Sequence, residues 1–203
     1  MDNSTITTIS IRNFKGIEDL QLNAKKLNAI IGKCGSGKSS LLDAIRFALT
    51  GKAGKEVIRK GCREASVVLR FSDNSTIERI RRTSENISKC NGKSSTKRSL
   101  DEFLTARNMN PSPGKGKPFV DMKEVSTGEF VCVAYILMTM IGEATKCHLF
   151  LIDNLDRLDT EYLNALLSLL EEDKKIEQVF LGGVDHADVE QTLNDKSFQI
   201  IHM

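Results

Sequence analysis

The chain has 203 residues, of which 40% are hydrophobic and 28% are charged, so it can bury one well-filled α/β core but not two. No stretch approaches 18 consecutive apolar residues, and the first residues lack the apolar core of a secretory signal, so we expect a soluble intracellular protein without a membrane partner. Five cysteines form no C-x-x-C pair and three histidines complete no zinc spacing, which predicts reduced thiols and argues against a zinc site.

The net charge of +2 is unevenly distributed along the chain. Residues 1–51 carry a net charge of +3, residues 52–120 carry +9, and residues 121–203 carry −10. The basic middle block can attract a phosphate backbone, or it can pair with the acidic block of its own or of a second copy. Charge alone favours neither interpretation.

The first predicted elements surround a glycine-rich loop. Residues 5–11, 20–22 and 27–31 are short apolar or alternating runs that predict strands. The sequence GKCGSGKSS follows directly, and after it the apolar spacing from Leu41 to Leu49 predicts a helix that ends at Gly51. The order is strand, glycine loop, helix.

The basic middle block begins with a predicted β-hairpin. Residues 65–82 alternate on both sides of a turn at 72–75, and a polar stretch with a turn at Asn91-Gly92 comes next. A short helix opened by a Ser99 cap then leads to NPSPGKGKPFVD, residues 110–121, which holds all three prolines and predicts a loop.

The last third of the chain alternates helices with apolar strands. We predict helices over 128–144 and 160–175, and strands over 149–153, 178–184 and 197–203. This alternation after the glycine loop is typical of a largely parallel sheet.

Three motifs point to a bound nucleotide. GKCGSGKS, from Gly32 to Ser39, fits the phosphate-binding pattern G-x-x-x-x-G-K-[ST] in the strand and helix context that this pattern needs. Its backbone N–H groups and Lys38 suit phosphate oxygens, and the Ser39 hydroxyl suits magnesium. The strand LFLID would lie beside the loop strand and bring Asp153 to magnesium. VSTGE, residues 125–129, offers an anion cradle at a helix start, although such a turn alone is more often a helix cap.

The order of these motifs resembles the ABC-type ATPases, and among them the SMC, RecF and SbcC group of chromosome-associated heads. The resemblance rests on IRNFKGI, GKCGSGKSS, VSTGE in place of a signature motif, LFLIDNLDRLD with its D-loop, and GGVDHAD with its switch histidine. It implies a P-loop NTPase of the ABC head type, with a mostly parallel central sheet flanked by helices and an antiparallel N-terminal β subdomain. It divides one head domain, 1–203, into an N lobe (1–107), a linker (108–120) where a coiled coil would emerge, and a C lobe (121–203).

The resemblance also implies roles for individual residues around ATP and Mg²⁺. Ser126, Thr127 and Gly128 would contact the nucleotide of a second copy in an ATP-dependent homodimer or heterodimer. Asp159, at the end of the D-loop, would bind at that interface, and His186 would sense the γ-phosphate. The residues expected to contact the nucleotide on this copy are Arg12, Asn13, Gly32, Lys33, Cys34, Gly35, Ser36, Gly37, Lys38, Ser39 and Ser40.

Three departures from the family pattern limit what the resemblance implies for this chain. No heptad repeat occurs between the two lobes, which indicates either a natural head without a coil or two lobes joined by a linker. No glutamine lies between Gln21 and Gln178, so the usual glutamine loop is missing. Asn154 stands where the family has a catalytic glutamate; an amide can hold water but cannot accept its proton. Asp156 is the nearest carboxylate that could substitute.

These observations favour an ATP-binding SMC/RecF-like head with slow hydrolysis that dimerises around Mg-ATP and acts in DNA or chromosome maintenance or repair. Duplex DNA is an expected partner, and the expected location is the chromosome or nucleoid in the cytoplasm, or a nucleus. The residues expected to contact DNA are Arg59, Lys60, Arg63, Arg70, Arg79, Arg81 and Arg82. The first alternative is a degenerate interaction module that regulates another ATPase without hydrolysis. A transporter ATPase subunit is less favoured because the glutamine loop is absent. A small-molecule kinase or GTPase is the last alternative, but these classes do not need VSTGE or the switch histidine.

Overall fold

The structure is a computed structural model that describes residues 4–110, 119–121, 129–145, 147–155, 158–184, 187–194 and 196–203. Its N-terminal half is built on an antiparallel sheet with the strand order β2-β1-β4-β5-β6-β7. The strands are β1 (Ile6–Phe14), β2 (Ile17–Asn23), β4 (Glu64–Phe71), β5 (Thr76–Arg82), β6 (Asn86–Cys90) and β7 (Lys93–Ser94). The predicted antiparallel N-terminal subdomain is therefore confirmed.

A second, parallel sheet forms the centre of the molecule, with the strand order β11-β3-β10-β9-β8. Its neighbouring strands all pair in parallel, as the alternation of helices and strands predicted. The strands are β3 (Leu27–Gly32), β8 (Phe119–Asp121), β9 (Leu149–Asp153), β10 (Gln178–Val184) and β11 (Gln199–His202).

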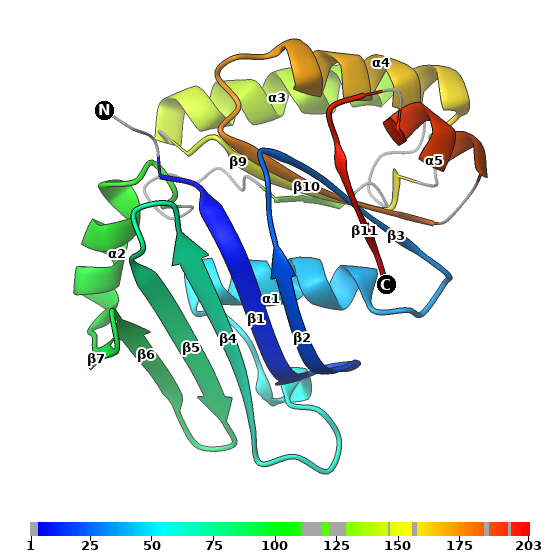
Figure 1. The fold of residues 1–203 in the computed structure, drawn as a ribbon. Helices are drawn as coiled ribbons and strands as arrows, with labels where there is room; N and C mark the ends of the chain where they lie inside the picture. The colour runs from blue at the N-terminus through cyan, green and yellow to red at the C-terminus, as the bar shows by residue number, and fades with distance from the viewer. Residues whose placement is uncertain are drawn as a thin grey trace.

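The helices separate into two layers around the parallel sheet (Figure 1). Helix α1 (Lys38–Thr50) lies between the two sheets, and α3 (Glu129–Thr145), α4 (Thr160–Glu172) and α5 (Ala187–Asn194) cover the other face of the parallel sheet. Helix α2 (Lys97–Thr105) lies beside the antiparallel sheet, and a short 3-10 turn spans Lys55–Val57. None of the helices in the described ranges is both long and apolar enough to cross a lipid bilayer.

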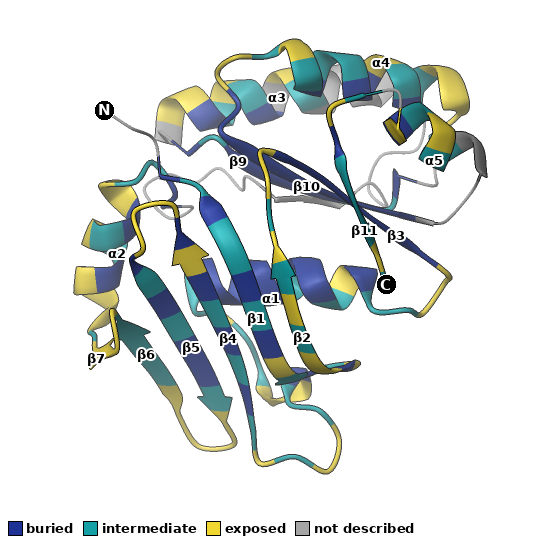
Figure 2. Cartoon of the chain, viewed as in Figure 1, coloured by how far each residue is buried: buried dark blue, intermediate teal, exposed yellow. Residues whose placement is uncertain are grey.

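Two hydrophobic cores hold these layers together, and both follow from the sequence pattern. The first surrounds α1, where Phe47 packs with inward-facing residues of both sheets such as Ile9 and Phe180. The second lies between the parallel sheet and α4, around Leu167 and Leu181. Figure 2 shows α1 and the central strands of the parallel sheet as the most buried parts of the chain. Two-sided burial explains why these strands read as continuous apolar runs.

Several local expectations were wrong. The helix cap is Thr96, whose hydroxyl accepts a hydrogen bond from the Ser99 backbone N–H, so α2 begins before the predicted Ser99 cap. The polar stretch after β5 forms the hairpin β6–β7, although its Asn91-Gly92 turn was predicted correctly and both residues have positive φ. Strand β8 lies at the end of the predicted proline loop because it pairs with β9, and helix α5 was not predicted.

Candidate nucleotide site

The glycine-rich loop connects the fully buried strand β3 to α1. Gly35 and Gly37 have φ angles of 82° and 112°, a left-handed conformation that costs glycine little. Gly37 caps α1 without a side-chain hydrogen bond, so no side chain occupies the first-turn N–H groups. The loop thus presents backbone donors at the positive end of a helix dipole, as the motif predicted.

Lys38 lies inside this loop. Its residue is only 9% exposed, and its Nζ donates hydrogen bonds to the carbonyl oxygens of Gly32 (2.7 Å) and Lys33 (2.8 Å). The Ser36 hydroxyl beside it is buried and has no hydrogen-bond partner among the described residues. A buried ammonium without a carboxylate and an unpartnered hydroxyl suit an oxyanion such as a phosphate.

The motif's first glycine has a different role from the one the sequence suggested. A Cβ on Gly32 would lie 2.6 Å from the Met203 carbonyl oxygen and 2.8 Å from the Ser36 Oγ. The Met203 N–H donates to the Ile31 carbonyl oxygen at 2.9 Å, which fixes the end of β11 against the loop. Gly32 is therefore required by packing, while Gly35, whose Cβ would meet open space, is required by its φ angle.

Asp153 approaches this loop from the end of β9, but β9 is not the neighbour of β3. Strand β10 lies between them, which corrects the expectation that the strand of Asp153 runs beside the loop strand. The middle strand carries Gly182 at the crossing point, and a Cβ there would lie 2.6 Å from Asp153 Oδ1 and 3.0 Å from Leu42. The missing side chain lets the carboxylate lie over β10 on the side of α1.

Asn154 directly follows this carboxylate and has a φ angle of 62°. Its backbone N–H donates to Asp153 Oδ1 at 2.9 Å, which turns the chain sharply at the strand end. Asparagine and aspartate adopt this left-handed region more readily than glutamate does. The backbone therefore suits the asparagine at this position, and a glutamate would be strained.

The remaining loop residues are at least partly exposed, as contact with a nucleotide requires. Lys33, Cys34 and Ser39 are exposed, and Ser40 is half-buried. Cys34 is a free thiol. Ser39 follows Lys38 in the first turn of α1, the position from which a hydroxyl could reach magnesium.

The turn between β1 and β2 lies beside the loop. Lys15 in that turn forms an ion pair with Asp43 of α1, and Ile17 would be 3.7 Å from a Cβ on Gly37. Asn13 accepts a hydrogen bond from the Arg59 N–H through its carbonyl oxygen. Arg12 instead lies on the solvent face of the sheet, 3.4 Å from Asp19, with no contact to the loop among its described interactions.

Several predicted site residues lie outside the described part of the chain. They are Ser126, Thr127, Gly128, Asp156 and His186. Asp159 is described: it is exposed and precedes the first residue of α4. Its predicted place at a dimer interface stays a prediction.

The residues predicted to bind DNA fall into three groups. Lys60, Arg63 and Arg70 are exposed and form no ion pair with any residue that the structure describes. Arg59 and Arg82 are neutralised by acids nearby, since Arg59 lies 3.4 Å from Glu18 and Arg82 lies 2.7 Å from Glu64. Arg79 and Arg81 lie on the inner face of β5, and Arg79 is buried.

Two functional positions were missed in the sequence. Gly182 belongs to the pair of glycines in QVFLGGV, which is unusual in a buried strand and is the signal that could have revealed it. Met203 carried no such signal, because only the packing of β11 against the loop brings it there.

Comparison with known proteins identifies the family. The sequence model of the RecF/RecN/SMC N-terminal domain matches residues 5–203. The chain belongs to this family. The resemblance to SMC and RecF heads that the five motifs indicated is thereby confirmed.

Members of the RecF/RecN/SMC family match shorter segments of the sequence. The DNA repair protein RecN of Synechocystis sp. is 47% identical over 58 residues, which are 28% of this chain. The DNA double-strand break repair Rad50 ATPase of Thermoplasma volcanium is 41% identical over 85 residues, which are 39% of this chain. The match covers 10% of the length of each relative, so the chain spans only a small part of them.

A solved Smc head domain with an extended coiled coil, bound to the C-terminal domain of ScpA and derived from Pyrococcus furiosus, has the same fold. Its TM-score is 0.76 with 14% sequence identity, over 93% of this chain and 92% of that one. The predicted α/β architecture of an ABC-type ATPase head is confirmed by this likeness.

Proposed function

We propose that this chain is an ATP-binding head that dimerises around Mg-ATP, with itself or with a related head, and acts in DNA repair or chromosome maintenance. The observation that carries the proposal is the gathering of Lys38 and Asp153 at one edge of the parallel sheet, across Gly182. The names of the RecN and Rad50 relatives support the DNA role. A location at the chromosome, in the cytoplasm or a nucleus, follows from that role.

The described residues fit a magnesium nucleotide. Lys38, the open N–H groups of α1 and the unpartnered Ser36 hydroxyl would hold phosphate oxygens. Ser39 and Asp153 would hold the metal, which when bound neutralises charge on the phosphates. Ser126, Thr127, Gly128, Asp159 and His186 would complete the site from the motifs of the C lobe.

Hydrolysis should be slow because Asn154 cannot act as a base. Its amide can orient a water molecule but cannot take a proton from it. We therefore propose that the head closes on ATP and opens slowly.

The test combines sedimentation with ATP turnover measured on the same sample. We expect a dimer with Mg-ATP, a monomer without it, and negligible turnover; Lys38→Ala should stay monomeric under both conditions. A wild-type protein that remains monomeric at saturating Mg-ATP would contradict the proposal. Brisk turnover abolished by Asp156→Asn would instead show that Asp156 is the base.

A substitution at position 154 tests the cause of slow turnover. Asn154→Asp adds a carboxylate without opposing the positive φ angle, and we expect turnover to rise by about tenfold or more. Asn154→Glu is the matched comparison: it restores the family residue but carries a backbone cost of roughly 1 kcal/mol. Its gain in turnover should therefore come with a lower melting temperature.

The degenerate module remains the second candidate, since Asn154 and the missing glutamine favour it. Such a module would bind ATP and a partner ATPase but would gain no turnover from either position-154 variant. ATP binding with unchanged turnover in Asn154→Asp would therefore favour the module over a slow motor head.

A further inference from the structure

A polar cavity of about 470 Å³ lies at the far end of α1 from the nucleotide loop. It is bounded by the end of α1, the strands β5 and β6, and the connection from β7 into α2. The residues that line it are Thr50, Gly51, Arg79, Glu85, Asn86, Ile87, Ser88, Ser94, Ser95 and Lys97. Hydroxyl groups and two basic side chains dominate this lining.

Arg79 is the unusual member of the cavity, because a side chain of this type is rarely buried without a carboxylate. The residue is 7% exposed. Its Nε donates to the Ala48 carbonyl oxygen at 3.0 Å, and its Nη1 donates to the Ser88 hydroxyl. Its Nη2 has no protein acceptor within the described ranges.

Gly51 holds the guanidinium in this position. A Cβ on Gly51 would lie 3.0 Å from both Cζ and Nη1 of Arg79, so only glycine leaves room for the flat group. The φ angle of Gly51 is 68°, and its N–H closes α1 by donating to the Phe47 carbonyl oxygen at 2.7 Å. The guanidinium thus lies over a helix end whose partial negative charge offsets part of its own.

The cavity nevertheless carries an excess of positive charge. Neither Arg79 nor Lys97 forms an ion pair with an acid in the part of the chain that the structure describes. The one acidic residue of the lining, Glu85, is engaged by Arg82, whose Nη1 lies 2.9 Å away. Burial lowers the pKa of the Arg79 guanidinium, and the nearby Asp101 opposes that effect only in part. An anion in the cavity would relieve this cost.

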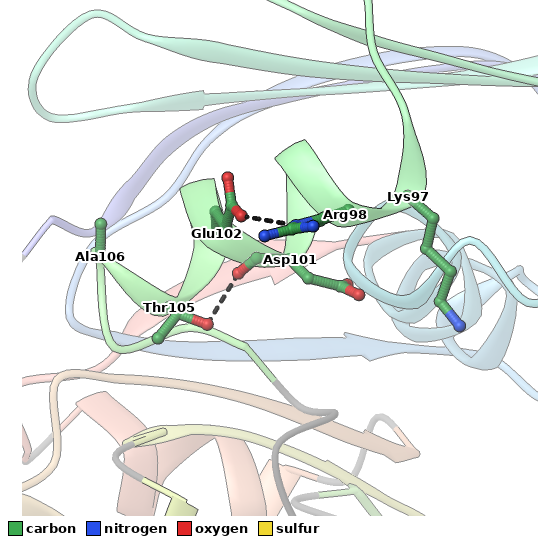
Figure 3. A pocket seen from close by; sticks show the side chains of 6 residues that line it. All are labelled: Lys97, Arg98, Asp101, Glu102, Thr105 and Ala106. Carbon is green, nitrogen blue, oxygen red and sulfur yellow. Dashed lines mark hydrogen bonds and ion pairs between the residues drawn. The ribbon is translucent and has the colours of Figure 1, made fainter.

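A neighbouring cavity of about 720 Å³ on the outer side of α2 does not share this property (Figure 3). Its lining pairs Arg98 with Glu102 at 3.1 Å, so its charges are compensated within one helix. Figure 3 shows Lys97 at the start of α2 with its ammonium directed away from that pair. Lys97 is therefore available to the Arg79 cavity.

We propose that the cavity of Arg79, Lys97 and Ser88 binds a single phosphate group of a nucleic-acid backbone. A guanidinium, an ammonium and hydroxyl groups line this one cavity, and its one acid, Glu85, is engaged by Arg82. Such a set of donors is suited to phosphate oxygens. The choice of a nucleic acid as the source of this phosphate rests on the proposed DNA role. It gives the basic block a buried contact point in addition to the exposed Lys60, Arg63 and Arg70, whereas Arg59 and Arg82 are engaged by acids.

The test is a titration of isotope-labelled protein followed by backbone amide resonances. A short duplex DNA of mixed sequence should shift the amides of Ser88, Ser95 and Lys97. Lys97→Gln should weaken binding by about tenfold and reduce the slope of log affinity against log salt by about one. Lys93→Gln is the matched control, since Lys93 carries the same charge on β7, shortly before α2, without lining the cavity. It should change affinity less than twofold.

Further measurements distinguish the possible sources of the phosphate and show which of the two proposals fails. Arg79→Met should weaken duplex binding, but it also removes a buried side chain on which the fold depends. Gly51→Ala is therefore a second variant, which displaces the guanidinium and should weaken duplex binding as well. Shifts of the same amides with inorganic phosphate but not with duplex would overturn the nucleic-acid assignment. Absence of shifts with either probe, or unchanged affinity in Lys97→Gln, would overturn the cavity as a phosphate site. ATP-induced shifts at Gly35 and Gly37 report the nucleotide site separately, so the two proposals can fail independently.

Discussion

The two edges of the parallel sheet use polar side chains in opposite ways. At the amino edge, Asn28 and Gln178 are fully buried, and each binds backbone groups of neighbouring elements. At the carboxyl edge, within the described ranges, Lys38 Nζ is bonded only to its own loop and Ser36 Oγ has no partner. The polar side chains at the amino edge stabilise the fold, whereas those at the carboxyl edge are available to bind a ligand.

Gln178 shows how the amino edge works. Its Nε2 donates to the carbonyl oxygens of Ile6 (2.7 Å) and Lys25 (2.8 Å), and its Oε1 accepts from the Ile6 N–H (2.9 Å). These bonds join β10 of the parallel sheet to β1 of the antiparallel sheet. Gln178 thus has a structural role at the edge of the sheet opposite the nucleotide loop.

The largest effect on stability is expected from Gln178→Leu. The change keeps the volume but leaves buried backbone groups of β1 without partners, so the free energy of unfolding should fall by about 3 kcal/mol. Urea unfolding measures this loss, and nucleotide affinity should stay within twofold because the site lies at the other edge. Gln199→Leu is the control: it removes one bond, to the Asn23 carbonyl oxygen, and should cost about 1 kcal/mol. Equal losses in both variants would contradict the comparison.

A smaller effect is expected at the carboxyl edge from Gly182→Ala. The new Cβ would lie 2.6 Å from Asp153 Oδ1, so the carboxylate must move. If Asp153 holds magnesium, the gain in ATP affinity that Mg²⁺ provides should fall by about tenfold. Gly183→Ala is the matched control, since its Cβ would meet Leu155 at an ordinary 3.4 Å. A loss of the magnesium effect in both variants would indicate general damage to β10 and would not support a role for Asp153.

The last expected effect depends on pH and concerns Glu177, the residue before Gln178. Burial raises the pKa of its carboxyl group to about 7, although a hydrogen bond from Asn108 opposes the shift. Because the folded state holds this proton more tightly than the unfolded state, Glu177 favours folding at low pH. That contribution should be lost as the pH rises from about 4.5 to about 7. Glu177→Gln should remove this decline in the free energy of unfolding. The difference in stability between the variant and wild type should therefore be more favourable to the variant at pH 8 than at pH 5. Parallel pH profiles of urea unfolding for the two proteins would contradict the assignment.

Much of the fold was predictable because its signals are local. The glycine loop, the apolar strands and the helical spacing from Leu41 to Leu49 each depend on residues close together in sequence, and the structure confirms them as β3, α1, β9 and β10. The hairpin β6–β7 was missed because its residues are polar and lie at the edge of the sheet, where hydrophobic alternation is weak.

The site was harder to predict than the elements that build it. The alternation in β5 could not show which face is inner, because Ile77 and Ile80 lie on opposite faces of the strand. The position of Arg79 therefore depended on the pairing of β5 with β4 and β6 and on the placement of α1. The order of strands in the parallel sheet was equally open, and only the structure places β10 between Asp153 and the nucleotide loop.

The sequence by itself determined a phosphate loop on a parallel α/β sheet, membership of the RecF/RecN/SMC family and an asparagine where a base is usual. The reason is that these features depend on residue type at short spacing. Only the tertiary structure decided that Gly32 makes room for Met203, that Gly182 makes room for Asp153, and that Arg79 is buried over Gly51. Each of these is a contact between segments far apart in the chain, and such contacts depend on how the layers pack.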